Sequence, residues 1–117
     1  MKTLITFKTA KKAKELNFPQ ERIKKNTHYN DFGILDPLGI QGSMITEHYY
    51  ACSQSTLQKW LREEKDIDVL IESVGGKRGY YFRLQEVPTG DLIQDSDIYG
   101  TYEEALEQGL LESLNLI

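Results

Sequence analysis

The sequence has 117 residues, of which 39% are hydrophobic and 27% charged, with a formal net charge of −4. These values suit a single globular domain, 1–117, while apolar runs of only a few residues exclude a membrane-spanning helix. Lys8 interrupts the first apolar stretch before the core of a signal peptide forms, so a cytoplasmic location is expected by default.

The first predicted element is a helix that starts at Thr6 or Phe7 and runs to Leu16. A narrow apolar stripe recurs at every third residue: Phe7, Ala10, Ala13 and Leu16. Asn17 suits the left-handed conformation that ends a helix, and Pro19 forbids continuation.

Residues 20–43 contain few regular patterns. Asp36-Pro37-Leu38-Gly39 predicts a type I turn, because proline presets φ at its second position. Residues 44–51 resemble a strand in which neither alternating set is clearly apolar. The first 52 residues therefore predict one helix and one additional hairpin.

A second helix is predicted shortly after residue 52. Ser53 or Ser55 is a suitable N-cap, because a serine hydroxyl accepts a hydrogen bond from a free backbone N–H. Leu57, Trp60, Leu61 and the stem of Glu64 line one side, and Gln58, Lys59, Arg62, Glu63 and Lys65 face water.

Residues 67–84 alternate as two strands of a β-hairpin do. The apolar face comprises Ile67, Val69, Ile71, Tyr80, Phe82 and Leu84. A two-residue turn at Gly75-Gly76 tolerates positive φ and would place Ile71 opposite Tyr80 and Asp68 opposite Arg83. A four-residue loop over 75–78 would shift the pairing by two residues, so both registers predict the same buried face.

A turn at 88–91 and short apolar pairs at 92–93 and 98–99 favour a third strand. A last helix is predicted from Thr101, where Thr101 and Glu104 form a capping box. Its apolar face comprises Tyr102, Ala105, Leu106, Gly109, Leu110, Ser113, Leu114 and Ile117. The place of Gly109 on this face predicts close approach to the sheet or to Trp60.

These elements predict an α+β fold in which amphipathic helices cover one face of an antiparallel sheet. The unit at 53–117 reads helix–strand–strand–(strand)–helix, and an N-terminal helix and a hairpin precede it.

Charge is unevenly distributed along the chain. Residues 1–30 carry eight Lys or Arg and two Glu, whereas residues 86–117 carry eight acidic residues and no Lys or Arg. Attraction between the two ends explains this asymmetry, and so does a basic arm for an acidic partner or head-to-tail self-association.

Groups for catalysis or metal binding are sparse. Cys52 is the only cysteine and lies four residues after His48, and His28 is the other histidine. A lone cysteine is most often a small buried hydrophobe, so we expect no catalytic residue, metal or cofactor and no enzymatic activity. The glycine-rich basic segment Gly75–Gly79 follows a strand but opens no helix, which favours a turn over a phosphate site.

A candidate binding surface lies on or near the hairpin and comprises Lys77, Arg78, Tyr81 and Arg83. The order helix, strands, helix resembles the double-stranded-RNA-binding domain in outline. That family has a lysine-rich motif at the start of its last helix that holds phosphates. This chain has Thr101-Tyr102-Glu103-Glu104 there, which repels phosphate, so the resemblance counts against that activity. Residues 99–105 also resemble the end of three-stranded DNA-binding modules of phage integrases. Nucleic acid is therefore a second possible partner, through the 67–85 hairpin and the basic N-terminal helix.

Three segments resemble, in the same chain order, small, functionally uncharacterised proteins of phages and prophages of gut bacteria. They are residues 6–15, residues 53–63 and residues 101–107. This resemblance implies a phage or prophage origin and an accessory role. Tyr49, Tyr50, Tyr81 and Tyr99 have no assigned core position, and tyrosine is enriched at interfaces. The main expectation is a non-enzymatic protein-interaction module that binds a protein partner or itself, without a membrane role.

Overall fold

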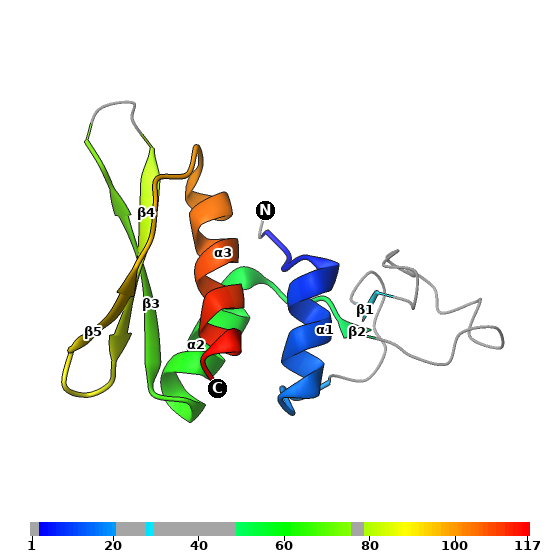
Figure 1. Ribbon diagram of the computed structural model, residues 1–117. Helices are drawn as coiled ribbons and strands as arrows, with labels where there is room; N and C mark the ends of the chain where they lie inside the picture. Colours follow the sequence, from blue (N-terminus) through cyan, green and yellow to red (C-terminus); the bar gives the residue numbers. More distant parts are fainter. Residues whose placement is uncertain (1–2, 21–27, 30–48, 76–78) are drawn as a thin grey trace, which may run out of the picture. The chain divides into compact units, whose positions relative to one another are not determined.

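The computed structural model describes residues 3–20, 28–29, 49–75 and 79–117 (Figure 1). Contacts divide the chain into two compact units, Met1–Ser53 and Gln54–Ile117. A single domain over 1–117 stays a prediction. Among the described residues, no helix is long and apolar enough to cross a membrane.

The first unit begins with α1, Phe7–Glu15. The Thr6 side chain caps it by accepting a hydrogen bond from the Thr9 N–H at 3.4 Å. Asn17, which follows the C-cap residue Leu16, has a φ of 67°, as the sequence predicts. Ala10 and Ala13 of the predicted stripe are fully buried, and Thr9 is buried beside them.

Two short strands complete the described part of this unit. β1, His28–Tyr29, pairs antiparallel with β2, Tyr49–Tyr50, as a hairpin requires. The predicted turn at 36–39 and residues 44–48 lie outside the described residues. The Tyr29 hydroxyl donates to the Ile5 carbonyl at 2.7 Å, and the Ile5 N–H donates to the Cys52 carbonyl at 2.9 Å. These bonds fix the segment before α1 to the rest of the unit.

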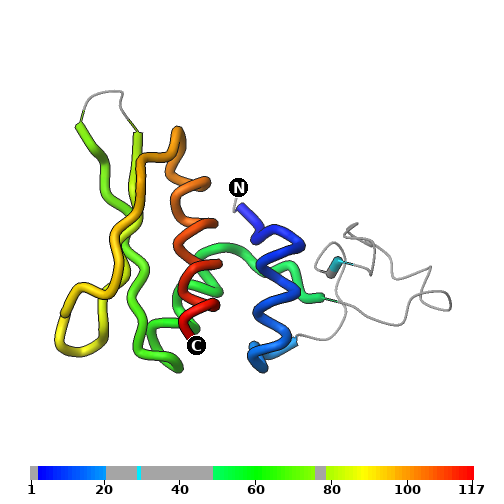
Figure 2. Tube along the Cα trace, in the orientation of Figure 1, coloured from blue at the N-terminus to red at the C-terminus, as the bar shows by residue number. Residues whose placement is uncertain are grey.

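The second unit has an antiparallel sheet in the order β3-β4-β5, with two helices on one face (Figures 1 and 2). Its elements in chain order are α2, Gln54–Glu64; β3, Ile67–Ser73; β4, Tyr80–Glu86; β5, Leu92–Asp95; and α3, Tyr102–Asn115. α3 packs on β3 and β4, and α2 packs on β3 and α3. The predicted α+β fold is confirmed.

The predicted apolar face of the hairpin forms the centre of this core. Ile67, Val69, Phe82 and Leu84 are buried, whereas Ile71 and Tyr80 are half-buried near the loop end. A Cβ built on Gly109 would lie 2.8 Å from Val69 Cγ1 and 3.1 Å from Phe82 Cβ. The predicted close approach of Gly109 is therefore confirmed, and its neighbour is the sheet.

The strand register is the shifted one, and the two-residue Gly75-Gly76 turn is wrong. Ile71 pairs with Phe82 and Ser73 with Tyr80, and the Val74 N–H donates to the Gly79 carbonyl at 3.0 Å. A loop of four residues follows from this pairing. Gly79 has a φ of 119°, and a Cβ there would overlap the Tyr99 carbonyl oxygen, so the close approach of 98–99 requires glycine. The faces stay as predicted, but Asp68 no longer opposes Arg83.

The helix predictions need smaller corrections. Gln58 was expected to face water, but its amide donates to the Val69 carbonyl at the edge of β3, at 2.6 Å. In the capping box, the Glu104 N–H donates to Thr101 Oγ1 at 3.1 Å, while the Glu104 carboxylate contacts the Thr101 hydroxyl at 3.3 Å. On α3, Leu111 is buried although it was not predicted, whereas Tyr102 and Ile117 are exposed.

Candidate functional site

Part of the predicted binding surface forms a polar cluster on the sheet face opposite the helices. Tyr81 and Arg83 flank buried Phe82 in β4, so the alternation of a strand turns both side chains to the outer face. Glu72 opposes Tyr81 on β3, and Asp95 opposes Arg83 on β5. Lys77 and Arg78 lie outside the described residues.

The four side chains of this cluster satisfy one another across three strands. The Tyr81 hydroxyl donates to Glu72 Oε2 at 2.6 Å. Arg83 Nη1 lies 3.5 Å from Glu72 Oε1, and Arg83 Nε donates to Asp95 Oδ1 at 3.2 Å. The guanidinium of Arg83 is therefore already neutralised, and a phosphate would compete with both carboxylates for it.

The same contacts shift two pKa values. The hydrogen bond to Glu72, together with burial and the Glu72 charge, raises the pKa of Tyr81 above its usual 10.0. The hydrogen bond to Asp95 and the charge of Glu72 raise the pKa of Arg83. Asp68, expected opposite Arg83, instead lies 3.9 Å from Arg62 Nη1 on α2.

We expect Glu72→Gln to lower the pKa of Tyr81 toward 10.0, because the substitution replaces the carboxylate that accepts the hydrogen bond of the phenol and removes its negative charge. A raised pKa in the folded state stabilises the protein below pH 10, and this contribution disappears as the pH rises through the folded pKa. Titration of 13Cζ-labelled tyrosine by NMR measures the shift. An unchanged Tyr81 pKa in the variant would exclude Glu72 as its cause.

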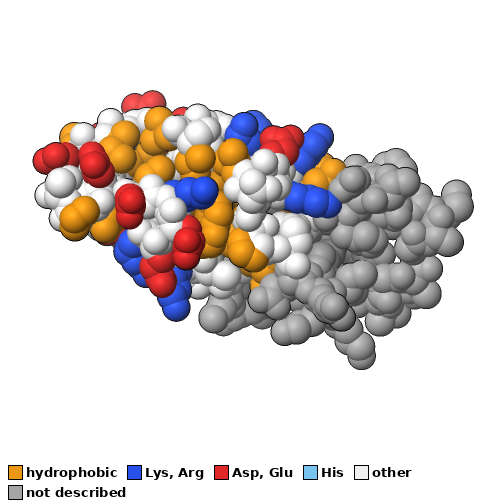
Figure 3. Space-filling model, turned by 90° about the horizontal axis from the view of Figure 1, so that it is seen from below, with side chains coloured by type: hydrophobic (Ala, Val, Ile, Leu, Met, Phe, Trp, Pro, Cys, Tyr) orange, Lys and Arg blue, Asp and Glu red, His pale blue; other side chains and the backbone are white. Residues whose placement is uncertain are grey.

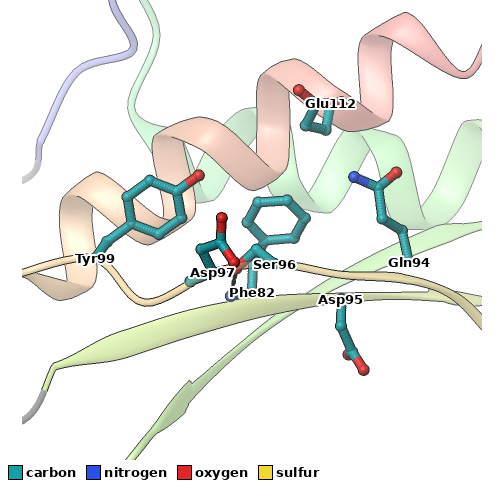
Figure 4. A pocket seen from close by; sticks show the side chains of 7 residues that line it. All are labelled: Phe82, Gln94, Asp95, Ser96, Asp97, Tyr99 and Glu112. Atoms are coloured by element: carbon teal, nitrogen blue, oxygen red, sulfur yellow. Dashed lines mark hydrogen bonds between the residues drawn. The ribbon is translucent and has the colours of Figure 1, made fainter.

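A second feature is an open groove of about 310 Å³ between the sheet edge and α3, here called the β5–α3 groove. It is lined by Phe82, Gln94, Asp95, Ser96, Asp97, Tyr99 and Glu112. Figure 4 shows Gln94, Asp97 and Tyr99 between the sheet and the helix, while the Asp95 side chain points to the other side of the sheet. The Tyr99 ring stacks on the ring of Phe82 with centroids 6.4 Å apart.

Ser96 fixes the segment after β5, which forms one side of the groove. Its N–H donates to the Phe82 carbonyl at 3.1 Å, and its hydroxyl accepts from the Phe82 N–H at 2.9 Å. The same hydroxyl donates to the Asp97 carbonyl at 2.7 Å. These bonds fix the segment after β5 against β4, and this segment supplies Asp97 to the lining of the groove.

Exposed apolar side chains alternate with carboxylates along the chain between residues 91 and 104, the stretch that also supplies most of the groove lining. Leu92 and Ile98 are each 55% exposed, and Ile93 and Tyr102 are each 42% exposed. Exposed acidic residues lie beside them in the sequence: Asp91, Asp95, Asp97, Glu103 and Glu104. We call these nine residues the acidic–apolar surface. No Lys or Arg occurs after Arg83.

The sequence predictions did not identify this surface. Leu92, Ile93 and Ile98 were interpreted only as strand residues, although their flanking aspartates were a signal of exposure. Apolar side chains reach the surface among charged groups on the face shown in Figure 3 as well. Large apolar side chains that stay exposed beside charged residues are candidates for a binding surface.

The first unit contains a separate basic site on α1. Lys11, Lys14, Glu15 and Tyr49 line an open pocket of about 320 Å³. Lys14 Nζ lies 4.9 Å from the centroid of the Tyr49 ring, within cation–π distance. The structure thus places Lys14 against an aromatic ring and Lys11 in the lining of the same pocket.

The remaining candidate residues from the sequence are Cys52 and the two histidines. Cys52 is buried, with only 2% of its surface exposed, in keeping with a small core residue. His48 lies outside the described residues. In the described ranges, no group of three or more His, Cys, Asp or Glu side chains is placed to hold a metal ion.

No protein-family model matches the chain, and comparisons with characterised proteins and with solved structures also give no match.

Proposed function

We propose that the protein is a non-enzymatic protein-interaction module that binds a partner through the acidic–apolar surface. The observation that carries the proposal is the exposure of Leu92, Ile93, Ile98 and Tyr102, which have five exposed carboxylates near them in the sequence. Covering these apolar groups is favourable, and the carboxylates select a partner that presents basic residues around an apolar centre.

The polar cluster on the outer sheet face supports the non-enzymatic part of the proposal. Tyr81, Glu72, Arg83 and Asp95 are joined to one another by hydrogen bonds and ion pairs. Such side chains stabilise the edge strand rather than offering a free acid or base. We further propose a phage-type accessory role in the cytoplasm, on the resemblance and the sequence features described above.

The proposal predicts capture of protein partners that depends on the acidic charges. Full-length protein on beads is incubated with bacterial host lysate, with and without nuclease. Asp91→Lys combined with Asp97→Lys should reduce capture at least tenfold, because two attractive charges become repulsive. Glu63→Lys with Glu64→Lys changes the net charge equally on exposed positions of α2 and serves as the matched control.

The proposal is supported if the unmodified protein captures a partner in the presence of nuclease and less of it at high salt. Of the two double variants, only the α2 control should retain this capture. Equal capture by both double variants would contradict it, because binding would then depend on net charge or on another surface.

Nucleic-acid binding through α1 and the hairpin is the second candidate. The pocket of Lys11, Lys14 and Tyr49 favours it, since ammonium groups beside an aromatic ring suit a nucleic-acid strand. The neutralised Arg83 and the Glu-rich start of α3 oppose it.

We expect no mobility shift of duplex DNA, single strands or duplex RNA at micromolar protein and physiological salt. If nucleic acid does bind, affinity should fall steeply between about 50 and 200 mM salt through counterion release. A salt-sensitive shift that disappears in Lys77→Glu combined with Arg78→Glu would make nucleic acid the preferred partner.

A further inference from the structure

We propose that the outer edge of β5 takes up an extended, basic peptide segment of a protein partner as an added strand. One Lys or Arg of this segment would occupy the β5–α3 groove. This inference rests on the proposed function and specifies the chemistry of the partner and the mode of binding.

The edge of β5 is available for strand addition. In the sheet order β3-β4-β5, β5 is terminal, and no strand in the described part of the chain pairs with its outer edge. The Ser96 N–H points to Phe82 on β4. Because backbone groups alternate along a strand, the N–H and carbonyl of Asp95 point outward, toward an incoming strand.

The opposite edge of the sheet is different. The Gln58 amide donates to the Val69 carbonyl on β3 and so occupies a backbone acceptor there. α2 also packs along this strand. Strand addition is therefore favoured at β5.

The packing of α3 creates the groove that an added strand needs. Gly109 lets the helix approach Val69 on β3 and Phe82 on β4. α3 does not cover β5 in the same way, and Gln94 on the inner face of β5 is only half-buried. Grooves between an edge strand and a helix bind extended peptides, with alternate peptide side chains entering the groove.

The lining of the groove selects a cationic side chain. Asp97 and Glu112 supply two carboxylates, Gln94 supplies an amide oxygen, and Tyr99 supplies an aromatic ring. A guanidinium or ammonium group satisfies this set of acceptors, and the guanidinium also stacks on aromatic rings. On the outer side, exposed Leu92 offers an apolar contact to the next peptide side chain.

Charge argues against a second copy of this chain as the added strand. Pairing β5 with itself would bring Asp91, Asp95 and Asp97 of both copies to one short interface, and like charges across strands repel. β5 has only four residues, and its register with β4 shifts between Leu84 and Gln85. Regular pairing with an added strand is therefore limited to a few residues. A short basic segment of another protein fits these limits.

An unbiased display library of ten-residue peptides, panned on the immobilised full chain, tests the inference. Enriched peptides should share a Lys or Arg with β-branched or aromatic residues at alternating positions. Asp97→Lys with Glu112→Lys should weaken the best peptide at least tenfold, whereas Glu63→Lys with Glu64→Lys should leave its affinity within twofold. Glu112→Gln, which keeps the side-chain volume, should weaken it in the same direction if the double variant fails to fold.

N-methylation of the best peptide tests the strand itself. Methyl groups on one alternate set of amides should abolish binding, and methyl groups on the other set should not, because only one set faces β5. Equal effects of the two sets would overturn strand addition while leaving the proposed function intact. Absence of basic enrichment, or affinity unchanged by the groove variants, would also overturn the inference, whereas the proposed function is tested separately by the capture experiment.

Discussion

Phe82→Ala should lower the free energy of unfolding by about 3–5 kcal/mol, the usual cost of removing a large buried aromatic side chain. Phe82 is 2% exposed, lies beneath Gly109 of α3 and stacks with Tyr99. The substitution leaves a cavity between the sheet and the helix. Chemical denaturation followed by circular dichroism measures the loss.

Gln85→Ala is the matched control for this prediction, because Gln85 lies in the same strand but is half-buried on the opposite face. It should change the stability by less than about 0.5 kcal/mol. Two variants of equal stability would show that the face assignment of β4 is incorrect.

Gly109→Val should cost about 3 kcal/mol, because side-chain atoms have no room where α3 meets the sheet. The Cβ alone would come within 2.8 Å of Val69 Cγ1, and a branched residue in a β-strand cannot move far. In an exposed helix the same change would be neutral or stabilising, since glycine is a poor helix former. The sign of the effect therefore reports the close packing.

The control for Gly109→Val introduces the same residue one position earlier, at Gln108, which is half-buried on α3. Gln108→Val should cost only about 0.5 kcal/mol through helix propensity. Similar losses for both variants in thermal and chemical unfolding would mean that α3 does not approach the sheet at Gly109.

The sequence predicted the faces of the hairpin but not its register. Alternation assigns Val69, Phe82 and Leu84 to the core in either register, since a shift by two residues preserves the faces. Gly75-Gly76 favours a two-residue turn locally. In the observed register Gly79 lies against the Tyr99 carbonyl, a contact distant in sequence that local turn preferences do not include.

The partners of Arg83 depended on the same long-range information. Its carboxylates, Glu72 and Asp95, come from two other strands, and only the observed register brings both to the guanidinium. Asp95 belongs to β5, whose register with β4 no local pattern predicts. The sequence therefore placed Tyr81 and Arg83 on one strand face but did not identify the carboxylates that contact Arg83.

The β5–α3 groove could not be predicted, because its existence depends on where α3 lies over the sheet. Because Gly109 has no side chain, α3 packs closely on β3 and β4, and the helix does not cover β5. One glycine on the buried face thus connects the packing of the core to the shape of the candidate binding site.

Photo-crosslinking in cells tests the central claim, that the acidic–apolar surface binds protein, most directly. Benzoylphenylalanine is placed at Ile98, which is 55% exposed within this surface, or at Glu64, which is exposed on α2. The account predicts protein adducts at Ile98 that are absent at Glu64 and are lost when Asp91→Lys and Asp97→Lys are added. Adducts only to nucleic acid, or equal adducts at both positions, would contradict it.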